Sequence, residues 1–233
     1  MSAFLDHFQP DPELPDERRI WRTAKPLMRD AVVAYAPFYP DYPALKVSKS
    51  RGPSNDPSCP SARLAGTDVD VMLYSHTHRF GGVQERAWNF ILDQPQLVEA
   101  SLRRKLFALH SRFYKQFQEE VLPEGRQFRK YWKAIESLVK WDDPSAVDHL
   151  FKLVAIGLAD SGLDDCGFSS FEFQTGWDRD HGLGVLMHKD RVLAADGMTE
   201  LIGSQGIVNA ARYVQQYDRD DGDFSLLNDE QSM

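Results

Sequence analysis

The chain has 233 residues, of which 42% are hydrophobic and 12% aromatic, so it can bury a sizeable core and is not a largely disordered protein. A formal net charge of −8 argues against general nucleic-acid binding. The two cysteines, Cys59 and Cys166, are not part of a C-x-x-C pair, which excludes a zinc ribbon and a dithiol redox motif. Two cysteines are also too few for a disulfide scaffold.

The first 17 residues are interrupted by prolines at positions 10, 12 and 15, which predicts an extended arm. This segment has no basic stretch followed by an apolar run, so we expect no signal peptide. The longest apolar run, residues 153–159, is too short to span a membrane. The sequence therefore predicts a soluble cytoplasmic protein that makes no membrane contact.

Short strands are predicted at residues 30–38 and 44–48, and a flexible polar loop follows at residues 48–62. The next segment, TDVDVMLYSHTH, alternates as a strand does. One face carries Val69, Val71 and Leu73, and the other carries Asp70, Met72, Tyr74, His76 and His78.

The middle of the chain is predicted to be helical. A first helix is expected at residues 83–92, and Asp93 with Gln96 indicates the start of a longer one. A further helix is expected at residues 126–140, and Asp143-Pro144 predicts a short helix that ends near Phe151. The longer helix carries an apolar stripe that needs a partner surface, formed by Val98, Leu102, Leu106, Leu109, Phe113 and Phe117.

From Leu153 onward the apolar period becomes two. Four short strands are predicted, and because the loops between them are short, consecutive strands should be antiparallel. The predicted strands are residues 153–159, 167–174, 183–188 and 191–195. The fold class is therefore α+β: a C-terminal antiparallel β-meander, a helical middle segment packed on the sheet, and a short N-terminal strand group. We expect a single domain at residues 18–217 and a disordered acidic tail at residues 218–233.

Charge is distributed unevenly along the chain. Residues 103–133 carry nine Lys or Arg against three Glu, and residues 218–233 carry six acids against Arg219. Such runs usually form solvated surfaces. The alternative is a nucleic-acid module that uses Arg103, Arg104 and Lys105, whose binding should be sensitive to salt.

His76 and His78 form an H-x-H pair, and alternate residues of a strand share a face. Both imidazoles could therefore bind one metal ion such as zinc, with Asp178, Asp180 or His181 of the later turn as a third ligand; the metal site that we predict uses His181. This arrangement defines a second functional hypothesis, a metal-dependent hydrolase. The alternative is that the histidines are surface residues and that no cofactor binds.

The segment WDRDHG, residues 177–182, places Asp178, Asp180 and His181 within four positions. A carboxylate beside an imidazole can perform acid–base chemistry, but aspartates and a glycine are also typical of a loop between strands. No nucleophile elbow, P-loop, dinucleotide fingerprint or H-E-x-x-H motif is present. We therefore favour Trp177, Asp178, Asp180 and His181 as a partner-binding set and predict no catalytic residue.

Residues Trp177 to Val192, W-D-x-x-H-G-L-G-V-L-x-H-x-x-R-V, resemble the C-terminal signature of a family of uncharacterised bacterial proteins. The resemblance extends over residues 65–197. Such families look like the acidic immunity proteins encoded beside secreted bacterial toxins. The resemblance implies a non-enzymatic protein that neutralises a basic toxin by occluding its functional surface.

Overall fold

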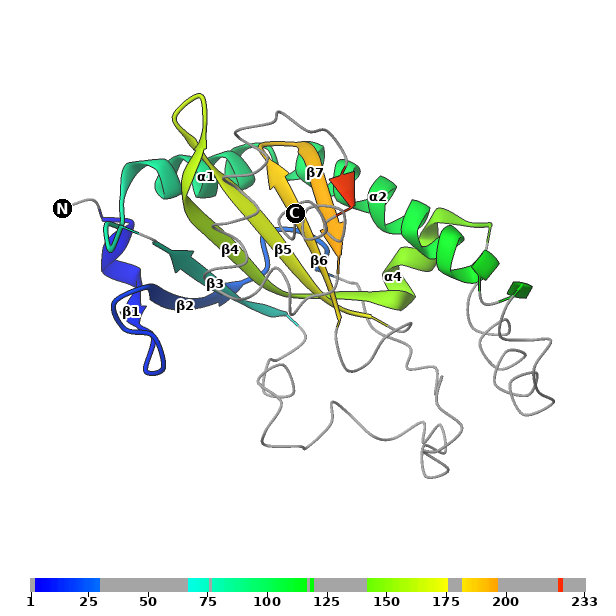
Figure 1. The fold of residues 1–233 in the computed structure, drawn as a ribbon, viewed down its shortest axis with the longest axis horizontal. Coiled ribbons are helices and arrows are strands. Elements are labelled where there is room, and N and C mark those ends of the chain that lie inside the picture. Colours follow the sequence, from blue (N-terminus) through cyan, green and yellow to red (C-terminus); the bar gives the residue numbers. More distant parts are fainter. Residues whose placement is uncertain are drawn as a thin grey trace, which may run out of the picture.

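The structure is a computed structural model that describes residues 3–29, 67–75, 77–116, 118–119, 142–175, 182–196 and 222–223 (Figure 1). Several predicted segments lie outside the described residues: the strands at 30–38 and 44–48, the loop at 48–62, the helix at 126–140, and the acidic tail apart from residues 222–223.

Within the described residues, eight strands form one sheet in which each strand lies beside the next strand in sequence. Of the seven pairs of neighbouring strands in this sheet, five are antiparallel. The strands are β1 (Gln9–Pro10), β2 (Arg18–Ala24), β3 (Asp68–Tyr74), β4 (Phe151–Leu163), β5 (Cys166–Thr175), β6 (Leu183–His188), β7 (Arg191–Asp196) and β8 (Gly222–Asp223).

The pairs β3–β4 and β7–β8 are parallel. A parallel pair needs a long crossover, and the helices that the sequence predicts lie between β3 and β4. They are α1 (Gly82–Asp93), α2 (Pro95–Gln116), the 3-10 turn η5 (Pro144–Ala146) and α4 (Val147–Leu150). The α+β fold with a C-terminal meander is therefore confirmed.

The helices cover one face of the sheet, as the predicted apolar stripe of α2 requires. Val98, Leu102 and Leu106 are fully buried in a core shared with Val71 of β3 and Phe171 of β5. A second apolar cluster lies on the other face of the sheet. Its members are Met72, Tyr74, Ala155, Ala159, Phe168, Leu186, Leu193 and Ala194.

The start of α1 is tied to the sheet by a buried side chain. Gln84 accepts a hydrogen bond from the Gly81 N–H (3.0 Å) and donates to the carbonyls of Tyr74 (2.9 Å) and Leu158 (3.2 Å). Because those carbonyls lie on the adjacent parallel strands β3 and β4, one glutamine positions the crossover helix over both strands. Nothing in the local sequence around Gln84 indicates this role.

The short helix after Asp143 forms as predicted, since the Asp143 carboxylate accepts a hydrogen bond from the Ser145 N–H (2.9 Å). Strand β4 is longer than predicted. The segment expected to be a loop after residue 159 continues as strand to Leu163, and only Asp164 and Asp165 form the turn, with φ of 48° and 60°. Two positive φ values suit the twist of a two-residue hairpin.

The N-terminal segment, where prolines predict an extended arm, contains a 3-10 turn at Leu5–His7, termed η1. Phe4 and Phe8 are buried in the helix-covered core and contact each other edge to face at 5.0 Å. Phe8 also contacts Trp21 of β2, and Trp21 contacts Trp88 of α1 (both 5.6 Å between ring centroids). These aromatic contacts attach the segment before β2 to the body of the protein.

Strand β2 was not predicted, because each of its two faces mixes arginine with an apolar residue. One face carries Arg18, Ile20 and Arg22, and the other carries Arg19 and Trp21. It pairs with β3 along its whole length. The predicted strand after residue 67 is confirmed only to Tyr74. His78 lies beyond the strand and has a φ of 57°, so the expectation that it shares a strand face with Tyr74 is wrong.

Candidate protein-binding loop

An acidic loop, residues 11–17, joins β1 to β2. Its sequence is DPELPDE, with four carboxylates and no basic residue. Asp11 is buried, whereas the carboxylate side chain of Glu13 is 84% exposed and Asp16 is also exposed. Between these two acids Leu14 is 38% exposed and is one of three large exposed apolar side chains among the described residues. The loop therefore presents an aliphatic side chain flanked by negative charge.

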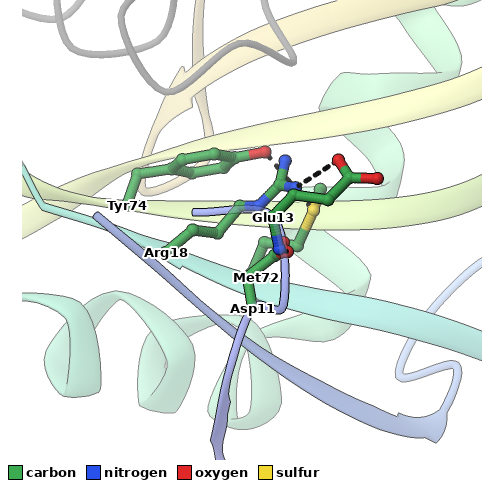
Figure 2. Close-up of polar contacts among 5 residues, drawn as sticks. All are labelled: Asp11, Glu13, Arg18, Met72 and Tyr74. Atoms are coloured by element: carbon green, nitrogen blue, oxygen red, sulfur yellow. Dashed lines mark hydrogen bonds and ion pairs between the residues drawn. The ribbon is translucent and has the colours of Figure 1, made fainter. Parts of the chain in front are cut away.

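A buried ion pair fixes the base of this loop. The Arg18 Nε donates to the Asp11 carboxylate, and a second guanidinium nitrogen lies 3.8 Å from Glu13 (Figure 2). The Glu13 N–H also donates to Asp11, at 2.7 Å. Burial alone would raise the pKa of Asp11, but these hydrogen bonds and the Arg18 charge hold it below its usual value. Asp11 therefore remains ionised and fixed at neutral pH.

Backbone hydrogen bonds fix the loop further. The Leu14 carbonyl accepts from the N–H groups of Glu17 (3.2 Å) and Arg18 (2.9 Å). The Asp11 N–H donates to the Arg18 carbonyl at 3.0 Å, which closes the loop at its start. The loop is therefore already ordered in the free protein. A partner that binds it does not have to offset the entropy lost when a flexible loop becomes ordered.

Arg18 is itself positioned by the sheet. It lies opposite Tyr74 of β3, whose fully buried hydroxyl donates to the Met72 sulfur at 3.3 Å (Figure 2). Burial would lower the pKa of Arg18, but the hydrogen bonds to Asp11 and Tyr74 raise it. Burial raises the pKa of Tyr74, and Glu172 adds to this effect at a pH where its carboxylate is ionised. The tyrosine is therefore a neutral hydrogen-bonding support.

A second loop, formed by Ser75 and residues 77–80, packs beside the acidic loop. The Ser75 N–H donates to the Glu17 carbonyl (2.9 Å), and the guanidinium of Arg19 lies 4.9 Å from the centre of the Phe80 ring. This second loop is organised by Asp160 of β4. Its carboxylate accepts hydrogen bonds from the hydroxyls of Ser75 (3.0 Å) and Thr77 (3.1 Å) and from the Thr77 N–H (3.3 Å).

His78 lies in this second loop. Its side chain is exposed, and its Nδ1 lies 3.0 Å from the Asp16 carbonyl oxygen. Since a carbonyl only accepts, Nδ1 must carry the proton in this contact. His78 thus supports the acidic loop from outside. The proposed partners in a metal site, His76 and His181, lie outside the described residues, and among those described no group of three or more His, Cys, Asp or Glu side chains could hold a metal ion.

The predicted partner-binding residues Trp177, Asp178, Asp180 and His181 also lie outside the part of the chain that the structure describes. Their role stays a prediction. The prolines of residues 1–17 predicted an extended arm, so the acidic loop was not foreseen. The available signal was Leu14, which stands alone among acids and prolines. An aliphatic residue without apolar neighbours in the sequence has no local partner to pack against.

The arrangement suits recognition of a basic surface. Exposed carboxylates around a rigid apolar residue attract cations over several ångströms, and the apolar residue adds contact area once the partner is bound. No helix within the described ranges is long and apolar enough to cross a membrane. Fold and site together define an α+β protein with a helix-covered sheet and an acidic loop at the β1–β2 edge.

Residues 59–202 match the model of a protein family described as a domain of unknown function, DUF6985. The match covers more than half of the chain, which therefore belongs to this family. It includes β3 to β7 and the helices between them, whereas β1, β2 and the acidic loop precede it. Searches of curated proteins and of solved structures found no match to this chain.

Proposed function

We propose that this chain is a non-enzymatic cytoplasmic binding protein that holds a basic protein partner at the acidic loop. A bacterial immunity protein that occludes the functional surface of a toxin is the biological role that fits this chemistry. The observation that carries the proposal is the exposed Leu14 between the carboxylates of Glu13 and Asp16, on a loop fixed by Arg18.

Three properties of the loop support this function. Its backbone is held by hydrogen bonds, so little ordering is required when a partner binds. Its exposed charges have one sign, and the whole chain carries −8, which speeds encounter with a basic protein. Leu14 offers an apolar contact that charge alone would not supply.

The loop precedes the residues that match the family. The proposal therefore concerns a feature of this chain and is not taken from the family description. The turn that contains Trp177 and Asp178 remains a proposed border of the same or a neighbouring interface.

Partner capture followed by a measured affinity tests the proposal. The full chain is immobilised and exposed to extract from the bacterium that produces it, alongside a loop variant, Leu14→Ala with Glu13→Lys and Asp16→Lys. The matched control is Leu92→Ala with Asp93→Lys, which changes an exposed leucine and an exposed acid elsewhere. Proteins retained by the wild type and the control but not by the loop variant are candidates.

Each candidate is then purified and titrated by calorimetry. We expect a basic protein whose affinity falls at least about tenfold for the loop variant, is unchanged for the control, and weakens with added salt. If that protein is toxic when expressed alone, co-expression of the wild type should restore growth. Equal binding by the loop variant and the wild type would overturn the proposal, as would the absence of any protein retained through the loop.

A further inference from the structure

A second exposed surface lies on the outer face of α2. Exposed residues recur there at spacings of three and four, which places them on one side of the helix. They are Leu97, Ala100, Arg104, Ala108, Ser111 and Lys115. Leu97 is 50% exposed, and Leu92, at the end of α1, is 48% exposed. We call the residues from Leu97 to Lys115 on this side the outer α2 face.

The outer α2 face carries two cations, Arg104 and Lys115. The Lys115 side chain is 75% exposed, and its Nζ lies 4.0 Å from the Glu119 carboxylate one turn further on, so the exposed Arg104 supplies most of the positive charge of this face. Glu99, two residues after Leu97, is engaged by Arg103 at 2.8 Å, and Arg103 also binds Asp148 at 2.8 Å. Arg103 therefore neutralises acids on the flank of the helix, while Arg104 faces solvent.

The acidic loop and the outer α2 face are complementary. The loop combines Leu14 with Glu13 and Asp16, and the face combines Leu97 with Arg104. The face thus has the chemistry expected of a partner for the loop, since an apolar residue and a cation lie on one side of the helix about two turns apart. The side chains of Ala100, Ala108 and Ser111 are small and uncharged, so an approaching loop can come close to the helix backbone.

The two surfaces do not meet within one molecule. The loop lies at the β1–β2 edge of the sheet, whereas α2 packs against β7 near the other edge, and Figure 1 shows them far apart along the molecule. A contact between them therefore requires two molecules. In a two-fold arrangement each copy would contribute one loop and one helix, so the same contact would form twice.

We propose that the acidic loop of one copy docks on the outer α2 face of a second copy. The contact is small and partly charged, so self-association is weak and reversible. It uses the loop on which the proposed function rests, so a basic partner that occupies the loop would release the second copy. Self-association would then keep Leu14 and Leu97 covered until the partner binds.

Sedimentation velocity over a range of concentrations, with the full chain and two charge-reversed variants, tests the contact. The loop-reversed variant is Glu13→Lys with Asp16→Lys, and the helix-reversed variant is Arg104→Glu with Lys115→Glu. Each alone places like charges in the contact and should weaken self-association at least about tenfold. Circular dichroism of each variant checks that it is folded, and Asp93→Lys is the matched surface control.

An equal mixture of the two variants provides the decisive measurement. The basic loop of one variant now faces the acidic helix of the other, and the remaining loop and helix are unchanged. The mixture should therefore associate nearly as well as the wild type. A wild type that stays monomeric at all concentrations, or a mixture that fails to associate, would overturn the contact. Partner binding that is lost in the loop-reversed variant but kept in the helix-reversed variant would leave the proposed function standing even then.

Discussion

Asp70 and Glu172 lie in one row across the sheet, separated only by Ala155 of β4, which pairs with both. Glu172 is 2% exposed, and one of its carboxylate oxygens has no hydrogen-bond partner among the described residues. Burial raises the pKa of Glu172 to about 8; Arg18 opposes this shift and Asp70 adds to it. Glu172 is therefore protonated in the folded protein at neutral pH.

The substitution Glu172→Gln should stabilise the protein, and more so at higher pH. Between the unfolded pKa near 4.5 and the folded pKa near 8, only the folded state retains the proton, so wild-type stability falls as pH rises. Glutamine mimics the protonated acid and removes this loss. Urea denaturation should show similar stabilities near pH 4.5 and a variant more stable by a few kcal/mol, to order of magnitude, near pH 8. A difference that does not change with pH would contradict this assignment.

The substitution Arg18→Met should destabilise the protein by roughly 3–5 kcal/mol, because it leaves the Asp11 carboxylate buried without its cation. The double variant with Asp11→Asn should recover much of that loss. Chemical denaturation measures both. Hydrogen exchange of the amides at residues 13–18 should become faster in the single variant, since the ion pair fixes the loop. Unchanged exchange would show that the backbone hydrogen bonds suffice.

The substitution Lys25→Met should stabilise the protein at pH 7. Lys25 is 1% exposed, and its ammonium nitrogen has no hydrogen-bond partner in the described part of the chain. Burial lowers the pKa of Lys25 to about 8, and Lys152 lowers it further. Since the unfolded state holds the proton up to about pH 10.5, wild-type stability rises between pH 8 and 10.5. The advantage of methionine, roughly 1–3 kcal/mol at pH 7, should therefore shrink by pH 10. Lys115→Met, at an exposed site, is the control and should show no such change.

The substitution Leu102→Ala should destabilise the protein by roughly 2–5 kcal/mol, because Leu102 is fully buried between α2 and the sheet. Leu97→Ala on the same helix is the matched control. Its side chain is half exposed, so it should change stability by about 0.5 kcal/mol or less. Thermal or urea unfolding of the two variants measures the contrast. Similar losses would mean that Leu97 packs against a surface in solution.

The prediction of elements from the sequence depended on how clearly polar and apolar positions separate. The stripe from Val98 to Leu109 and the alternation around Phe171 and Phe173 have a strong period, and the structure confirms a helix and a strand there. Strand β2 has no such period, since the half-buried Arg18 pairs with Asp11 and Arg22 binds Asp70 at 2.8 Å. Its pairing with β3 is a long-range interaction that local composition does not reveal.

The candidate site also depends on contacts that a local sequence pattern does not reveal. The histidine pattern was predicted from a strand that the structure ends at Tyr74, four residues before His78. The acidic loop was in view as a proline-rich segment, but its order depends on Arg18, on a carbonyl contact with His78 and on the neighbouring Ser75. None of those contacts follows from the residues of the loop alone.

The sequence by itself determined the fold class, the order of the described helices and strands from β3 to β7, and the acidic character of the chain, because periodicity and composition are local properties. Only the tertiary structure decided that residues 3–17 pack onto the sheet edge and that Asp11 lies buried against Arg18. It also decided that Leu14 and Leu97 face solvent. Burial and charge pairing depend on which distant segments meet, and that is fixed when the sheet assembles.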